Sequence, residues 1–107
     1  MDKAYIAAII AKLEDVRQRP LMWIGQFENI VPFINGFNTA CLSTIYNIRD
    51  NFYEEVANER GWHVSAQGPE SFMREKGLTE SQIVDELLTI HIELWKRRYN
   101  YIESLQK

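Results

Sequence analysis

The sequence is poor in cysteine, glycine and proline, and it has no long apolar run. Its single cysteine, Cys41, cannot form a disulfide within the chain. Because neither Gly-x-Gly nor Asp-x-Gly occurs, the backbone lacks the tight turns that cradle phosphate groups. No segment approaches the roughly 18 consecutive apolar residues of a membrane span. The N-terminal segment also lacks the basic start and uninterrupted apolar block of a signal peptide, so we expect a cytoplasmic protein outside the membrane.

Charge and metal-ligand patterns argue against further classes of function. With 12 Lys and Arg against 15 Asp and Glu, the net charge of −3 disfavours a general nucleic-acid binder and is compatible with a basic protein partner. Neither Glu-x-x-His nor His-x-x-x-His occurs, so we expect no metal site and no cofactor. The two histidines, His63 and His91, have no recognisable acid or thiol partner, and Cys41 has no activating neighbour. We therefore expect no catalytic residues and no enzyme activity.

Helical periodicity dominates what the sequence does contain. At 107 residues and 46% hydrophobic content, the chain is long enough for one domain with a modest core. Strand signals are weak and limited to residues 22–24 and 62–64. We expect residues 1–107 to form a single all-α domain, a bundle of four to six helices with long first, second and C-terminal helices.

The first helix is expected from Asp2 to Gln18, where apolar residues fall on one third of the circumference. Pro20 should end it, because the residue before a proline is pushed out of the helical region. Residues 21–24 are then expected as a short extended crossing, with Met22 and Trp23 filling the core.

The second helix is expected to begin near Asn29 and to continue to Arg60, with a kink near residues 47–51. Its apolar residues follow at steps of three and four, and Cys41 lies in the middle of the stripe, so the thiol should be buried.

The acidic residues near the end of this helix, together with a following tryptophan, are the candidate partner-binding residues: Asp50, Glu54, Glu55, Glu59 and Trp62. The acids form either a merely solvated face or a patch that mimics phosphates and binds the basic cleft of a nuclease. The tryptophan either packs at the edge of the core or is presented to a partner as an aromatic anchor.

The C-terminal half contains the clearest helix signals. A short helix should start at Gly68-Pro69 and end at Gly77. A long helix should run from Glu80 to about Leu105, preceded by a capping box formed by a threonine and a glutamine three residues later. His91 lies within its apolar face, which favours a packed core histidine over a ligand. The aromatic and basic end of this helix, with Trp95, Arg98 and Tyr99, is a rival partner surface.

One segment resembles known families. After the first helix comes Arg19-Pro20-Leu21-Met22-Trp23-Ile24-Gly25, followed by a Phe-rich helix that includes residues 32–37. The ATPase domain of gyrase B-like proteins has a similar string, but this chain is short and lacks the Gly-x-Gly turns of that nucleotide site. The string and the Phe-rich helix also resemble the N-terminal half of small bacterial immunity-like proteins, encoded beside contact-dependent growth inhibition or other polymorphic toxins.

The resemblance to immunity-like proteins implies that the chain binds and neutralises a cognate bacterial toxin by occluding its active site. A basic nuclease domain is the toxin expected from the acidic candidate surface. The alternative is a non-catalytic helical interaction or regulatory module with another protein partner. A toxin-like reading frame beside the gene would separate the two hypotheses.

Overall fold

The structure, a computed structural model, describes residues 3–45, 50–63 and 68–105. Within these ranges it contains six α-helices, one 3₁₀ turn and no strand, which confirms the predicted all-α fold. The elements are α1 (Lys3–Gln18), α2 (Pro20–Ile24), η1 (Phe27–Asn29), α3 (Ile30–Ile45), α4 (Phe52–Glu59), α5 (Pro69–Glu75) and α6 (Glu80–Leu105).

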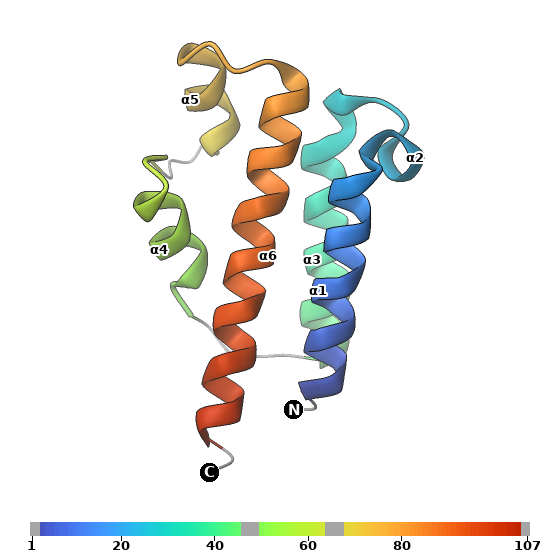
Figure 1. Cartoon of the computed structure of the whole chain (residues 1–107), viewed down its shortest axis with the longest axis vertical. Helices are drawn as coiled ribbons and strands as arrows, with labels where there is room; N and C mark the ends of the chain where they lie inside the picture. The colour runs from blue at the N-terminus through green and yellow to red at the C-terminus, as the bar shows by residue number, and fades with distance from the viewer. Residues whose placement is uncertain (1–2, 46–49, 64–67, 106–107) are drawn as a thin grey trace.

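The long helix α6 organises the molecule. It runs through the centre of Figure 1, with α1 antiparallel to it on one side and α4 and α5 along the other. Helix α3 lies on the same side as α1, and α2 forms a projection at the upper right. Ten side chains of α6 are buried, from Ile83 to Ile102. The central place of α6 explains why its apolar stripe is so wide, since neighbours cover several of its faces.

The core confirms the apolar stripes predicted for the first and last helices. On α1 the buried residues are Ile6, Ile9, Leu13 and Val16. On α6 Trp95 has no exposed surface, and the guanidinium carbon of Arg98 lies 4.4 Å from the centre of its ring. Cys41 on α3 is buried, as predicted.

The expectation for residues 21–24 is wrong. They belong to the one-turn helix α2, which begins at Pro20 because a proline at the first helical position needs no amide partner. Only Ile24 of this turn is buried, whereas Met22 is 74% exposed and Trp23 is 38% exposed. These two side chains therefore do not fill the core. Gly25 ends the turn at φ 77°, and its N–H donates to the carbonyl of Leu21 over 2.9 Å.

The second helix, α3, begins at Ile30, close to the predicted Asn29, but its predicted continuation to Arg60 is wrong. Helix α3 ends at Ile45, residues 46–49 lie outside the described ranges, and α4 starts at Phe52. The carboxylate of Asp50 accepts the backbone N–H of Phe52 over 3.2 Å. This local bond satisfies a first-turn amide of α4, so Asp50 marks the start of a new helix and not the interior of an old one.

The predicted signals for helix ends in the C-terminal half are confirmed. Thr79 accepts the N–H of Gln82 through Oγ1 over 3.2 Å, and its own N–H donates to the Gln82 side chain over 2.8 Å, which is the expected capping box. Gly77, at φ 90°, follows α5, and the N–H of Leu78 donates to the carbonyl of Met73. Among the described residues, no helix combines the length and the apolar character that a membrane crossing would need.

Candidate functional site

The predicted acidic residues lie along α4 and just before it, where they face the basic residues of α6. Asp50 pairs with Arg98 through two hydrogen bonds, of 2.9 and 3.2 Å, and each of the two side chains is only 12% exposed. Asp50 therefore acts within the protein, where it joins the start of α4 to α6. It presents little of its charge to a partner.

The glutamates of α4 differ in whether they pair with a basic residue of α6, and so in how much of their charge a partner could contact. The guanidinium of Arg97 lies 3.5 Å from the carboxylate of Glu55 and also donates to Glu59. These carboxylate side chains are 53% and 62% exposed, so the pairs are solvated and weak. Glu54 is exposed and pairs with no other described residue. The negative charge of this acidic surface is thus partly neutralised by Arg97. Because Glu54 has no such ion pair, a substitution of Glu54 tests the surface most directly.

The rival surface at the end of α6 does not exist as predicted. Trp95 is fully buried, and Arg98 is covered by Asp50 and the indole ring. Tyr99 keeps intermediate exposure. From the sequence we expected the acidic residues of α4 and the basic end of α6 to be two separate partner surfaces. In the fold, side chains of the two sets contact each other.

Trp62 fixes the end of α4 to α6. Its indole N–H donates to Glu86 over 2.7 Å, and its ring meets the Phe72 ring edge to face, with centroids 5.9 Å apart. Arg60 donates two further hydrogen bonds, of 2.6 and 2.9 Å, to the same carboxylate. The Arg60 hydrogen bond is the main cause that lowers the pKa of Glu86. Trp62 is half-buried, so this geometry gives it an internal anchoring role.

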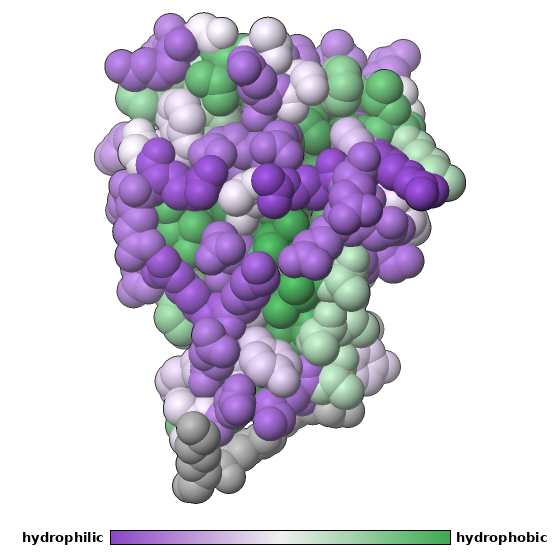
Figure 2. All heavy atoms as spheres, viewed as in Figure 1, coloured by the Kyte–Doolittle hydropathy of each residue, from purple (hydrophilic) through white to green (hydrophobic). Residues whose placement is uncertain are grey.

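Helix α2 exposes three consecutive apolar side chains, which we call the α2 patch: Leu21, Met22 and Trp23. Leu21 is 50% exposed, and the Lys12 ammonium of α1 lies 4.6 Å from the Trp23 ring centre. Figure 2 shows hydrophobic surface at the upper right, over α2, beside strongly hydrophilic side chains. These three consecutive side chains point in different directions around the turn, and each leaves apolar surface in contact with water.

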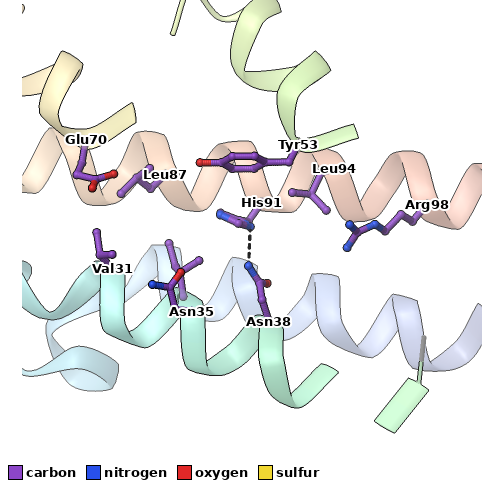
Figure 3. Close-up of a pocket in the computed structure, with 10 residues that line it drawn as sticks. Val31, Asn35, Asn38, Tyr53, Glu70, Leu87, His91, Leu94 and Arg98 are labelled. Carbon is purple, nitrogen blue, oxygen red and sulfur yellow. Dashed lines mark hydrogen bonds between the residues drawn. The ribbon is translucent and has the colours of Figure 1, made fainter. Parts of the chain in front are cut away.

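A cleft of about 250 Å³ lies between α3, α4, α5 and α6. Four aliphatic side chains form its walls, namely Val31, Ile34, Leu87 and Leu94. Six polar or charged side chains complete it, namely Asn35, Asn38, Tyr53, Glu70, His91 and Arg98. Figure 3 shows these groups gathered between α6 and α3, with the Tyr53 ring above His91.

His91 is the buried polar centre of the cleft. It is 6% exposed, and its Nδ1 lies 3.5 Å from the Asn38 side-chain nitrogen. The Tyr53 ring lies 5.2 Å from the imidazole, centroid to centroid. Desolvation, with a smaller contribution from Arg98, lowers the pKa of His91 to about 4, so the ring is neutral at pH 7. Burial and the nearby Glu70 raise the pKa of Tyr53 to about 12, so its hydroxyl stays protonated.

The remaining reactive side chains are not assembled into a catalytic group within the described ranges. Burial raises the pKa of the Cys41 thiol, which disfavours the thiolate needed for nucleophilic attack. His63 is exposed. The described residues contain no group of three His, Cys, Asp or Glu side chains placed to hold a metal ion.

Sequence reasoning missed the cleft, although a signal was present. Asn35 and Asn38 stand three residues apart on one side of α3, and His91 interrupts the apolar face of α6. Polar residues on otherwise apolar faces of two helices indicate either a buried polar contact or a shared cavity. Only the packing of α3 against α6 shows that they lie together.

Comparison of the chain with protein-family models, with curated proteins and with solved structures finds no match.

Proposed function

We propose that the chain is a non-catalytic protein-binding domain that acts as an immunity protein, neutralising a cognate bacterial toxin by covering its active site. The resemblance of residues 19–25 to immunity-like proteins supports the class of function. The observation that carries the proposal is the exposure of the α2 patch, which lies inside that same segment.

The α2 patch has the chemistry of an interface anchor. Trp and Met offer large contact areas, and residues of this kind dominate the free energy of many protein complexes. A stable interface needs about 800 Å² from each partner, which is more than one helical turn provides. The neighbouring face of α1 can supply the rest, since Tyr5 and Lys12 lie seven residues apart, on the same side of that helix.

The acidic surface supplies a second, electrostatic contribution. Glu54 and the exposed parts of Glu55 and Glu59 keep negative charge on the α4 side of the molecule. With a net charge of −3, this field favours encounter with a basic nuclease domain. Because α4 and α2 lie on opposite sides of α6 in Figure 1, substitutions on the two helices test separate surfaces.

The test is co-expression with a candidate toxin domain from the reading frame beside this gene, combined with measurement of the dissociation constant by calorimetry. The double variant Leu21→Ser, Met22→Ser should lose protection of growing cells and bind at least about tenfold more weakly. Its melting temperature should stay near that of the parent because both side chains are exposed. The matched control is Leu105→Ser, which alters an exposed leucine at the far end of α6.

Charge reversal at Glu54 separates the two surfaces. If Glu54→Lys abolishes protection while the α2 double variant still protects, the acidic surface is the contact and the α2 assignment is wrong. If the parent protein neither binds nor protects against the adjacent toxin, the immunity function itself fails. In that case the alternative, an interaction or regulatory module with another partner, remains.

A further inference from the structure

We propose that the cleft between α3, α4, α5 and α6 binds a small organic amine, with the ammonium group at Glu70 and the apolar body between the aliphatic walls. This site is distinct from the protein-binding surfaces on α2 and α4. The inference does not rest on the proposed immunity function.

The shape of the cleft suits a short, elongated molecule. Its lining on α6 runs from Leu87 to Arg98, which corresponds to about 16 Å along the helix axis. Its volume of about 250 Å³ is below the range of drug-sized pockets and suits a ligand about the size of a single amino acid. Aliphatic side chains face one another from α3 and α6, so the middle of the cleft favours an apolar body.

The charges of the lining favour a cation. Arg98 and Glu70 are the two formally charged residues among those that line the cleft. The Arg98 charge is balanced by two hydrogen bonds to Asp50. Glu70 forms no ion pair with another described residue, and Arg74 on the same helix interacts with it only electrostatically. The α5 end of the cleft therefore carries a carboxylate that is only partly compensated.

The neutral polar groups suit the same ligand. Figure 3 shows the Tyr53 hydroxyl directed along the cleft toward the end where Glu70 lies, with Asn35 on the opposite wall. Glu70, Tyr53 and Asn35 thus offer a carboxylate, a hydroxyl oxygen and an amide oxygen along the cleft, which are the kinds of acceptor that an ammonium binds. His91, neutral at pH 7 and 6% exposed, adds a ring nitrogen that points to the same side as the Tyr53 hydroxyl. It adds no positive charge that would repel the ligand.

The experiment titrates the full chain with three probes of similar shape and different charge, namely phenethylamine, phenethyl alcohol and hydrocinnamate. Binding is followed by two-dimensional NMR through the ring signals of His91 and Tyr53. We expect phenethylamine to shift both rings with a saturable curve and a dissociation constant of about 1 mM or lower. The alcohol should bind about tenfold more weakly, because it keeps the apolar body but loses the charge-assisted hydrogen bond.

Two variants locate the ammonium. Glu70→Gln keeps the size of the side chain and should weaken phenethylamine about tenfold while leaving the alcohol unchanged. Glu75→Gln removes an equal charge from the same helix α5, outside the cleft lining, and should leave both affinities unchanged. The proposal is overturned if hydrocinnamate binds as tightly as the amine, if Glu70→Gln has no effect on the amine, or if none of the three probes shifts the His91 ring saturably. None of these outcomes bears on binding of the toxin, so the proposed function stands or fails separately.

Discussion

Two adjacent arginines of α6 should differ strongly in what they contribute to stability, although the sequence presents them as one basic run. Arg98 forms two hydrogen bonds with Asp50, and both side chains are 12% exposed. Arg97 is 31% exposed, and its partners Glu55 and Glu59 are 53% and 62% exposed. The perturbation is replacement of each arginine in turn by methionine, which keeps most of the aliphatic stem.

The expected magnitudes follow from burial. Arg98→Met leaves the Asp50 carboxylate nearly buried with one neutral donor, the N–H of Phe52, and loss of one partner of such a pair costs about 3–5 kcal/mol. The contact of Arg98 with the Trp95 ring is lost as well. Arg97→Met breaks only solvated pairs, each worth about 0.2–1 kcal/mol. The free energy of unfolding should therefore fall several times further for Arg98→Met.

A double substitution tests whether the stranded charge causes the loss. Asp50→Asn keeps an oxygen that can accept the N–H of Phe52, and it removes the charge. The free energy of unfolding of the double variant Asp50→Asn, Arg98→Met should therefore be at least about 1 kcal/mol higher than that of Arg98→Met alone. The assay is urea denaturation followed by circular dichroism, with a common slope for all variants. Equal destabilisation by Arg97→Met and Arg98→Met, or a double variant no more stable than Arg98→Met, would refute the assignment of a buried pair.

Three further predictions concern the core and the caps. The pKa of His91 is about 4 in the fold against 6.5 when unfolded, so between these pH values the unfolded chain binds more protons. About 3 kcal/mol of stability, fully present above pH 6.5, should therefore be lost as the pH falls toward 4. Denaturation at several pH values should show that this pH dependence vanishes in His91→Gln and persists in His63→Gln. Thr79→Ala removes the cap of α6 and should cost about 1 kcal/mol in urea denaturation. Trp95→Ala should cost about 3–5 kcal/mol because the ring is fully buried, whereas Trp23→Ala should cost about 1 kcal/mol in thermal melts.

Each of these predictions has a contradicting outcome. A pH slope that survives in His91→Gln would mean that other groups account for the loss of stability in acid. An unchanged free energy of unfolding in Thr79→Ala would mean that the capping box contributes nothing net. Equal costs for the two tryptophan variants would mean that the Trp23 ring is packed as tightly as that of Trp95.

The sequence predicts best where a helix has both a clear apolar stripe and explicit end signals. The last helix was expected from Glu80 to about Leu105 and is found from Glu80 to Leu105, because the capping box at its start and the continuous stripe act locally. The first helix follows the same pattern up to Gln18. Such signals need no knowledge of which elements meet, so periodicity is sufficient to find them.

Prediction failed where a side chain acts on a distant partner or on its own backbone. Asp50 looked like one of several exposed acids, yet it accepts the N–H of Phe52 at the start of α4 and pairs with Arg98, 48 residues away. A helical wheel places Asp50 beside Glu54, but it carries no information about which helix packs against that face. The cleft was missed for the same reason, since its polar lining comes from four helices and the spacing within any one of them is unremarkable.

The segment at residues 19–25 shows how a wrong structural expectation bears on function. If Met22 and Trp23 filled the core, their chemistry would be explained by folding alone and the segment would say little about a partner. In the fold only Ile24 of α2 serves the core, and the turn is already fixed by Pro20 at its start and Gly25 at its end. The other large apolar side chains of this turn leave apolar surface in water and contribute little to folding, namely Leu21, Met22 and Trp23. A protein partner that buries this turn accounts for all three side chains at once, and for that reason the α2 patch, more than the acidic surface, is where neutralisation of a toxin should be tested first.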